Sequence, residues 1–254
     1  MAIYYSAVFF MFGAILGSFF NVVGERLPEG KSIVKPRSHC PKCKHTLTPI
    51  ELVPIFSYII QRGKCKNCKE KIPPIHPIYE FLCGLIFLLS YLSFNFSYEL
   101  IIVLSLVSML LIIIVSDYLY MIIPDEVLIF FGIILIIEIF FIYGIVALLY
   151  RILSGIIAFM IMFLIKIVGD KIFKRESMGG GDIKLLFFFG LCLGWEMAIF
   201  SIFLGSMLGF PVSLIILKVK KDNVLPFGPF LSLAAIIILL LHFDFTKLVE
   251  LLTL

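Results

Sequence analysis

The sequence has little charge and almost no tryptophan. Only 15% of its 254 residues are charged, 61% are hydrophobic, and a single Trp stands beside 27 Phe. Soluble domains are about one quarter charged and half apolar, so the composition excludes a soluble fold and a disordered chain. The same composition argues against a small secreted disulfide scaffold. With a mean hydropathy of +1.13, the chain is predicted to be an all-α polytopic membrane protein.

Long apolar runs divide the chain into about eight transmembrane helices. The predicted spans are 3–23, 78–94, 100–116, 124–143, 145–168, 183–193, 197–217 and 229–241. Gly144 marks a tight reversal between the fourth and fifth, and the sixth is short for a bilayer that takes roughly 20 residues. The first run lacks a basic start and a small-residue cleavage site, so we expect a retained helix. Residues 243–254 are predicted to form an amphipathic tail at the interface.

Positive charge is concentrated in one segment. Residues 24–77 carry 11 Lys and Arg against four Asp and Glu, whereas the rest of the chain has an acidic excess. The positive-inside rule favours a cytoplasmic loop, and the lack of interleaved basic and aromatic residues argues against nucleic-acid binding. With the N-terminus outside, the cytoplasmic loops hold 19 of the 21 Lys and Arg, counting Lys166 with its neighbouring loop. These loops are 24–77, 117–126, 169–184 and 218–228.

Two C-x2-C pairs stand in the basic loop. Cys40 and Cys43 form the first pair, and Cys65 and Cys68 form the second after 21 intervening residues. Four thiolates at this spacing are typical of a closed tetrahedral Zn²⁺ site, which is structural rather than catalytic. A pair of disulfides is the alternative, and the reducing cytoplasmic side disfavours it. The remaining histidines and cysteines near the loop or in the spans are interpreted as non-ligands: His39, His45, His76, Cys83 and Cys192.

Two ionisable residues lie at the ends of membrane helices, which makes them candidates for function. Asp117 ends the third span, and Asp182 opens the sixth after the run 179–181 of three glycines. The topology puts both at the cytoplasmic membrane surface. Two neighbouring carboxylates share a proton and can act as general base and general acid, as in aspartyl proteases. The glycines allow close backbone approach and conformations that other residues avoid.

Plainer interpretations of the same residues stay open. Asp182 is at a position where an N-cap is common, and Asp117 and Asp125 could be solvated residues that pair with Lys184. If the two aspartates do form a pair, the helix dipoles predict a division of roles. Asp182, at a helix N-terminus, is expected to be the charged base, and Asp117, at a helix C-terminus, to hold the shared proton.

The order and spacing of these motifs resemble the bacterial type IV prepilin peptidases, membrane aspartyl proteases that carry a GxGD motif. The resemblance covers nearly the whole chain. The matching segments are 17–23, 26–28, the two cysteine pairs, 54–58, 77–80, Asp117 with 124–125, 179–182 with 184–185, and 226–230. One mild departure is His76 before Pro77, where an aromatic residue is usual.

The resemblance implies a function for the candidate residues. Asp117 and Asp182 would be the catalytic pair. The supporting residues would be Gly179 and Gly181 of the GxGD motif, together with Asp125, Lys184 and Glu80. The substrates would be prepilins or pseudopilins, cut on the cytoplasmic side after the glycine that ends a short basic leader. Many family members also N-methylate the new N-terminus with S-adenosylmethionine, and the zinc site has a supporting role. Glu80 would contact substrate or cofactor, or else only reach the basic loop.

The resemblance also implies an organisation and a location. A first helix (1–23) and a basic zinc loop (24–77) precede a seven-helix membrane catalytic domain with a short tail (78–254). The protein would lie in the plasma membrane of a bacterium. The pilin system that it serves and its oligomeric state stay open.

Two functions of other classes are alternatives to this one. A proton-coupled transporter with a zinc-stabilised regulatory loop would also use intramembrane carboxylates. However, both aspartates lie at one surface rather than at the bilayer midplane, and the sequence has no internal repeat. A non-catalytic assembly factor would leave the glycine-rich turn before Asp182 without a purpose.

Overall fold

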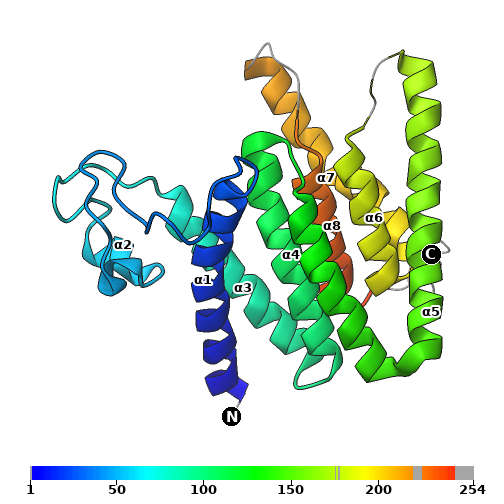
Figure 1. The fold of residues 1–254 in the computed structure, drawn as a ribbon, viewed down its shortest axis with the longest axis horizontal. Coiled ribbons are helices and arrows are strands. Elements are labelled where there is room, and N and C mark those ends of the chain that lie inside the picture. Colours follow the sequence, from blue (N-terminus) through cyan, green and yellow to red (C-terminus); the bar gives the residue numbers. More distant parts are fainter. Residues whose placement is uncertain (1, 175, 177, 220–224, 244–254) are drawn as a thin grey trace. The chain divides into compact units, whose positions relative to one another are not determined.

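The protein is all-α. The computed structural model describes residues 2–174, 176, 178–219 and 225–243, and these contain eight α-helices and one short 3-10 helix (Figure 1). The helices are α1 (Ala2–Arg26), η1 (Pro49–Leu52), α2 (Phe56–Ile60), α3 (Ile75–Phe94), α4 (Glu99–Tyr120), α5 (Asp125–Phe173), α6 (Gly180–Leu193), α7 (Trp195–Val219) and α8 (Gly228–Leu240). Each predicted span corresponds to one helix or to one arm of α5. The predicted tail lies, beyond Phe243, outside the described residues.

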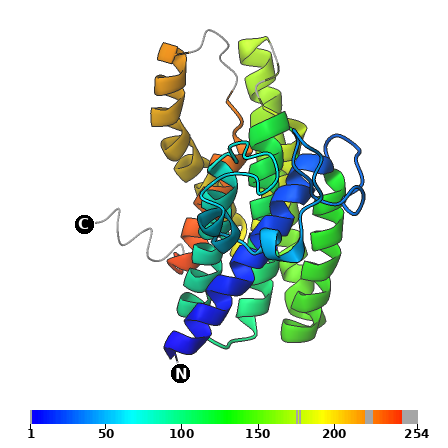
Figure 2. The same cartoon turned by 90° about the vertical axis from the view of Figure 1, so that its left-hand side faces the viewer.

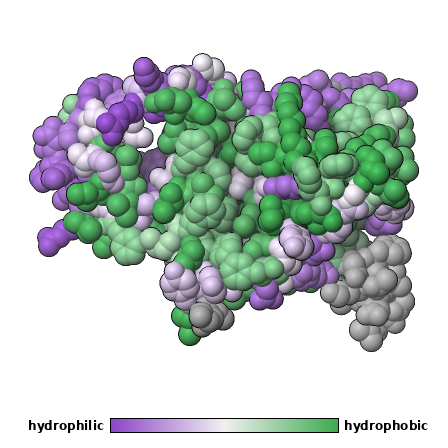
Figure 3. Space-filling view, turned by 60° about the horizontal axis from the view of Figure 1, so that its bottom comes forward, coloured by the Kyte–Doolittle hydropathy of each residue, from purple (hydrophilic) through white to green (hydrophobic). Residues whose placement is uncertain are grey.

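The helices are built for a bilayer rather than for water. Within the described residues α1, α3, α4, α5 and α7 are long and apolar enough to cross a membrane, while α8 is apolar but shorter. Large apolar side chains are exposed along them, and hydrophobic atoms cover much of the face that Figure 3 shows. Such exposure is stable only where lipid takes the place of water. The predicted fold class is confirmed.

Gly144 divides α5 into two arms. Its φ of +81° and ψ of 176° lie in a region that is essentially open only to glycine. The arms 125–143 and 145–173 therefore run in opposite directions (Figure 1). The reversal predicted between the fourth and fifth spans is confirmed.

The chain forms two compact units, Met1–Asn95 and Phe96–Leu254. In the first unit α1 packs along α3. The loop that connects them begins at the C-terminal end of α1 (Figure 2). Gly13 and Gly17, four residues apart, allow this close approach: a Cβ on Gly13 would lie 2.5 Å from the Phe87 Cβ, and one on Gly17 would lie 2.6 Å from the Cys83 Cβ. Small residues at this spacing are typical of membrane helix pairs. The helix α3, grouped by the sequence with the later spans, thus packs with α1.

In the second unit α4 is the central helix. In the most apolar stretch of α4, 72% of the residues are buried. In the corresponding stretches of α5 and α7 the buried share is 17%. It packs against α5 and α8, and α6 lies along α5. Gly155 in α5 and Gly190 in α6 bring those two helices together, because a Cβ on either would lie 2.7 Å or less from a backbone carbonyl oxygen of the partner helix. The short helix α6 is therefore held against α5, and its N-terminal end, at Gly181, contacts Ile123 in the turn that follows α4.

Candidate functional site

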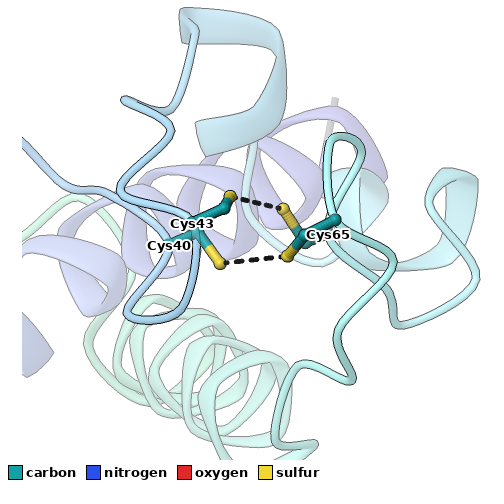
Figure 4. A group of neighbouring side chains, drawn as sticks. Cys40, Cys43 and Cys65 are labelled. Carbon is teal, nitrogen blue, oxygen red and sulfur yellow. Dashed lines mark hydrogen bonds between the residues drawn. The ribbon is translucent and has the colours of Figure 1, made fainter.

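The four loop cysteines form one cluster in the first unit. Their sulfur atoms all lie within 4.8 Å of one another. The Sγ atoms of Cys40 and Cys68 are 3.7 Å apart. Those of Cys43 and Cys65 are 3.9 Å apart (Figure 4). A tetrahedron of sulfurs about 2.3 Å from Zn²⁺ has edges of about 3.8 Å, so the donor set fits a zinc ion. All four thiols are free in the structure, and their spacing fits metal ligands better than the alternative of two disulfides.

The two cysteine pairs are folded in the same way. The Cys40 amide donates to His45 O and the Lys44 amide to Cys40 O, while the Cys65 amide donates to Glu70 O and the Lys69 amide to Cys65 O. Both lysines that follow the second cysteine have a positive φ, 58° for Lys44 and 61° for Lys69. The spacing of the ligands therefore forces the same left-handed residue at the end of each knuckle, a conformation for which glycine is preferred.

The electrostatics of the cluster also suit a cation. Backbone N–H groups of Cys43 and Lys42 donate to Cys40 and lower the pKa of its thiol to about 6. At Cys68 a backbone hydrogen bond at Glu70 lowers the pKa, but burial and the neighbouring thiols raise it to about 11, so Cys40 is the thiol that ionises first. A thiolate is the form that binds metal. Lys42 of the first knuckle pairs with Glu70 beside the second, so the ion pair joins the two halves of the site.

None of the three nearby histidines belongs to the cluster of four sulfurs. His39 Nδ1 lies 2.9 Å from Arg37 O, and His45 Nε2 lies 3.2 Å from a carboxylate oxygen of Glu51. His76 Nδ1 lies 3.1 Å from the Asn21 amide nitrogen. The interpretation of these histidines as non-ligands is consistent with the geometry.

The Glu80 side chain contacts the basic loop. Its Oε2 accepts the Ile55 amide at 2.8 Å. Ile55 has φ 64° and ψ −54°, and the Phe56 amide donates to Pro54 O at 2.6 Å. This is a γ-turn of the rare, strained form, unusual for a β-branched residue. Glu80 therefore fastens a strained turn of the loop to α3.

Asp117 lies near the end of α4 and is only 6% exposed. Its Oδ2 accepts the backbone N–H of Gly228, the first residue of α8, at 2.9 Å. A Cβ on Gly228 would lie 2.6 Å from that oxygen. Pro229 follows, and it has no N–H to offer. The N-terminus of α8 therefore points at the Asp117 carboxylate, a contact that the sequence analysis missed although it noted segment 226–230.

Asp182 is the third residue of α6 and is 8% exposed. The N-cap of α6 is Gly179, so the interpretation of Asp182 as an N-cap is wrong. Gly179 and the two glycines after it have no positive φ, so the expectation of an unusual backbone there is also wrong. The other expected reason for glycine, close backbone approach, is correct at Gly181, where a Cβ would lie 2.9 Å from the Ile123 Cβ.

The turn after α4 brings the two aspartates together. Met121 ends α4 in the left-handed conformation, and Ser116 Oγ donates to Ile122 O at 2.5 Å. This folds Ile123 back against Gly181, one residue before Asp182. The two carboxylates interact electrostatically. The six-residue spacer between Asp117 and Pro124 thus positions the pair.

Asp125 and Lys184 form an ion pair beside the aspartates. Lys184 Nζ lies 2.6 and 2.8 Å from the two carboxylate oxygens of Asp125. The alternative in which Asp125 pairs with Lys184 is correct, whereas the partner of Asp117 is the Gly228 amide. The ion pair joins the start of α5 to Lys184, the fifth residue of α6, and Lys184 therefore has a structural role next to Asp182.

The fold and these groups define a class: a multi-pass membrane protein with a buried pair of carboxylates and a four-cysteine loop. Two family descriptions match the chain, the bacterial peptidase A24 N-terminal domain over residues 11–94 and the type IV leader peptidase family over residues 104–214. The chain belongs to the type IV leader peptidase family. No solved structure matches it.

Named relatives agree with this membership. The chain is similar to the prepilin leader peptidase/N-methyltransferase of Bacillus subtilis, with 34% identity over 91% of this chain and 92% of that protein. The Stutzerimonas stutzeri protein of that name is 30% identical over 90% and 88%. For the Myxococcus xanthus protein the identity is 34% over 83% of this chain, which spans 63% of the longer relative. Membership of the leader peptidase family identifies an enzyme and excludes the two alternatives, the transporter and the assembly factor.

Proposed function

We propose that the protein is a membrane aspartyl endopeptidase that removes the short basic leader of prepilins or pseudopilins, with Asp117 and Asp182 as its catalytic pair. The observation that carries the proposal is the burial of these two interacting carboxylates at the ends of α4 and α6. The relatives are named for activity on prepilin leaders. Paired carboxylates that share one proton provide both the base and the acid for peptide hydrolysis.

The surroundings of the pair support Asp117 as the ionised member. A carboxylate is stabilised by an N–H donor and by the positive end of a helix dipole. Asp117 receives both from Gly228 at the start of α8, whereas Asp182 lies in the first turn of its own helix α6. The helix dipoles alone predict the charge on Asp182, because each aspartate is then considered only on its own helix. The contact with α8 favours the reverse assignment.

In this assignment the protons balance over one cycle. Asp117 takes a proton from a water molecule while the oxygen of that water attacks the scissile carbonyl carbon. Asp182 donates its proton to the carbonyl oxygen. The tetrahedral intermediate then returns that proton to Asp182 as the C–N bond breaks. Asp117 gives its proton to the leaving amine. The pair regains its starting state with one water consumed.

The charge pattern supports an orientation with this site at the cytoplasmic face of a bacterial plasma membrane. In that orientation the basic loop and the ends of α4 and α6 meet the cytoplasm, where water and the leader are available. The apolar segment of a prepilin would enter laterally from the bilayer. Cys40, Cys43, Cys65 and Cys68 would hold a structural zinc ion, whose chemistry is to fix the fold of the loop rather than to act on the substrate.

N-methylation of the new N-terminus with S-adenosylmethionine is proposed from the names of the relatives. The sequence contains no G-x-G-x-x-G fingerprint of a nucleotide-binding turn, and no residue is assigned to the methyl donor.

Mass spectrometry of a prepilin incubated with the protein in liposomes tests both activities. Loss of the leader is expected without any added cofactor. A further mass increase of one methylene, dependent on S-adenosylmethionine, is expected if methyl transfer also occurs. An intact wild-type protein with zinc bound that leaves several prepilins uncut would contradict the proposed peptidase.

A further inference from the structure

The loop of the first unit carries an exposed apolar surface that the catalytic proposal does not use. It lies on η1, α2 and the turn between them, and consists of Ile50, Leu52, Val53, Phe56, Ile59 and Ile60. Ile50 and Ile60 are the most open, at 76% and 75% exposure. We name these six residues the apolar patch. Side chains of this size exposed together mark an interaction surface rather than a folding defect.

The backbone holds the patch outward. Ile55 makes its strained turn between η1 and α2, fixed by Glu80. At the other end of α2, Gly63 has a φ of +67°, and its amide donates to Tyr58 O. The Tyr58 ring contacts Gly63, since a Cβ there would lie 2.9 Å from the Tyr58 hydroxyl. With Tyr58 turned to the loop, Phe56, Ile59 and Ile60 on the same helix are left exposed.

A basic pocket adjoins the patch. Its volume is about 440 Å³, and Ile50 and Ile60 lie on its wall together with four cationic side chains, Arg62, Lys64, Lys66 and Lys69. None of these four makes an ion pair within the described residues. The one acidic group on the wall, Glu51, already accepts the amide and hydroxyl of Thr48. The pocket therefore has a large excess of positive charge.

The position of the apolar patch between two membrane helices favours the lipid bilayer as its partner. The loop is joined at one end to α1 and at the other to α3, and both helices are long and apolar enough to span a membrane. The patch cannot leave the bilayer surface by more than the length of the loop. Apolar side chains beside cations are the combination by which a segment lies in the interface of an anionic membrane.

We propose that the apolar patch and its basic pocket form an interfacial anchor, in which the patch enters the lipid and the pocket binds the headgroup phosphate of an anionic phospholipid. The anchor fixes the zinc loop at the membrane surface. It does not depend on the catalytic pair, so a failure of either proposal leaves the other testable.

Fluorescence quenching in the full-length protein tests the anchor. Ile60→Trp in a Trp195→Phe background places the indole on the patch, and Val34→Trp places it at a loop position of similar exposure, 72%, outside the patch. The protein is reconstituted in nanodiscs of phosphatidylcholine alone or mixed with phosphatidylglycerol. In the mixed discs we expect brominated lipid to quench the Ile60→Trp indole and acrylamide to quench the Val34→Trp indole.

Charge variants separate the pocket from the loop as a whole. Arg62→Gln with Lys66→Gln is expected to abolish the lipid quenching of the Ile60→Trp indole. Lys35→Gln with Arg37→Gln, which removes the same charge elsewhere in the loop, is expected to leave it. Zinc content, measured on every variant, reports that the loop is folded.

Three results would overturn the anchor. The first is an Ile60→Trp indole that acrylamide quenches as strongly as the Val34→Trp indole in the mixed discs. The second is lipid quenching that is equal with and without phosphatidylglycerol in the discs. The third is an indole that becomes protected from acrylamide only after a prepilin is added, which would make the patch a substrate-docking surface.

Discussion

Among single residues, Gly228 directly contacts the proposed catalytic pair although it has no side chain. Its amide is the hydrogen-bond donor to Asp117, and the carboxylate occupies the space where a Cβ would be. A side chain at this position must displace either the carboxylate or the start of α8. Gly228 is therefore a positioning residue, and its effect should be on the chemical step.

Gly228→Ala is expected to lower kcat by about 10- to 100-fold, since a hydrogen bond to a charged group contributes about 1.5–3 kcal/mol. KM should stay close to its original value. The activity should also fall off at a higher pH on the acid side, because Asp117 loses a donor that favours its ionised form. Kinetics with a prepilin peptide across pH measure all three.

Gly209→Ala in α7 is the matched control. The new Cβ would lie 3.4 Å from the Phe230 ring, an ordinary contact with the same helix α8. A Gly209→Ala variant as impaired as Gly228→Ala, or a Gly228→Ala variant whose pH profile is unmoved, would show that Gly228 acts only through packing.

The glycines before Asp182 are not equivalent. A Cβ on Gly181 would press on Ile123, whereas a Cβ on Gly180 would meet nothing within 4 Å. Gly181→Ala should therefore separate the turn after α4 from α6 and reduce cleavage strongly, while Gly180→Ala should retain most activity. The test compares the initial cleavage rates of the two variants at equal amounts of folded protein. An equal loss of cleavage activity in both variants would contradict the prediction.

At the scale of elements, the two zinc knuckles each contain a strained lysine. Lys44 and Lys69 have a positive φ, so Lys44→Gly and Lys69→Gly should relieve strain of about 1 kcal/mol each. Both variants should release zinc to a chelator more slowly than the wild type. Lys66→Gly, inside the second knuckle at a residue without positive φ, should not slow release, and slower release there would show that lost charge is the cause.

The elements differ in how far the sequence predicts them. Hydropathy places every span, and Gly144 marks the reversal in α5, because apolar length and glycine are local signals. The C-x2-C spacing identifies the metal ligands for the same reason. The hydrogen bond from Gly228 to Asp117 joins residues 111 positions apart in the sequence, and no local pattern contains it. The helix dipoles predict a charged Asp182 and a protonated Asp117, and the contact between Gly228 and Asp117 favours the reverse.

For the whole molecule, the charge distribution predicts an orientation. Truncated fusions measure it: a reporter active only outside the cytoplasm should be active after Asn95 and inactive after Met121, and a fluorescent cytoplasmic reporter should give the opposite result. The reason is that 19 of the 21 Lys and Arg lie on the side assigned to the cytoplasm. The reverse pattern at both fusion points would place the aspartates on the outer face.

The central claim is that Asp117 and Asp182 together cut the leader. The most direct measurement is mass spectrometry of a prepilin incubated with wild type, Asp117→Asn and Asp182→Asn in liposomes, with zinc content and helicity as checks of folding. We predict that the wild type removes the leader and that each folded variant does so at no detectable rate, because one carboxylate cannot serve as both base and acid. Leader removal by either folded variant at the wild-type rate would contradict the catalytic pair.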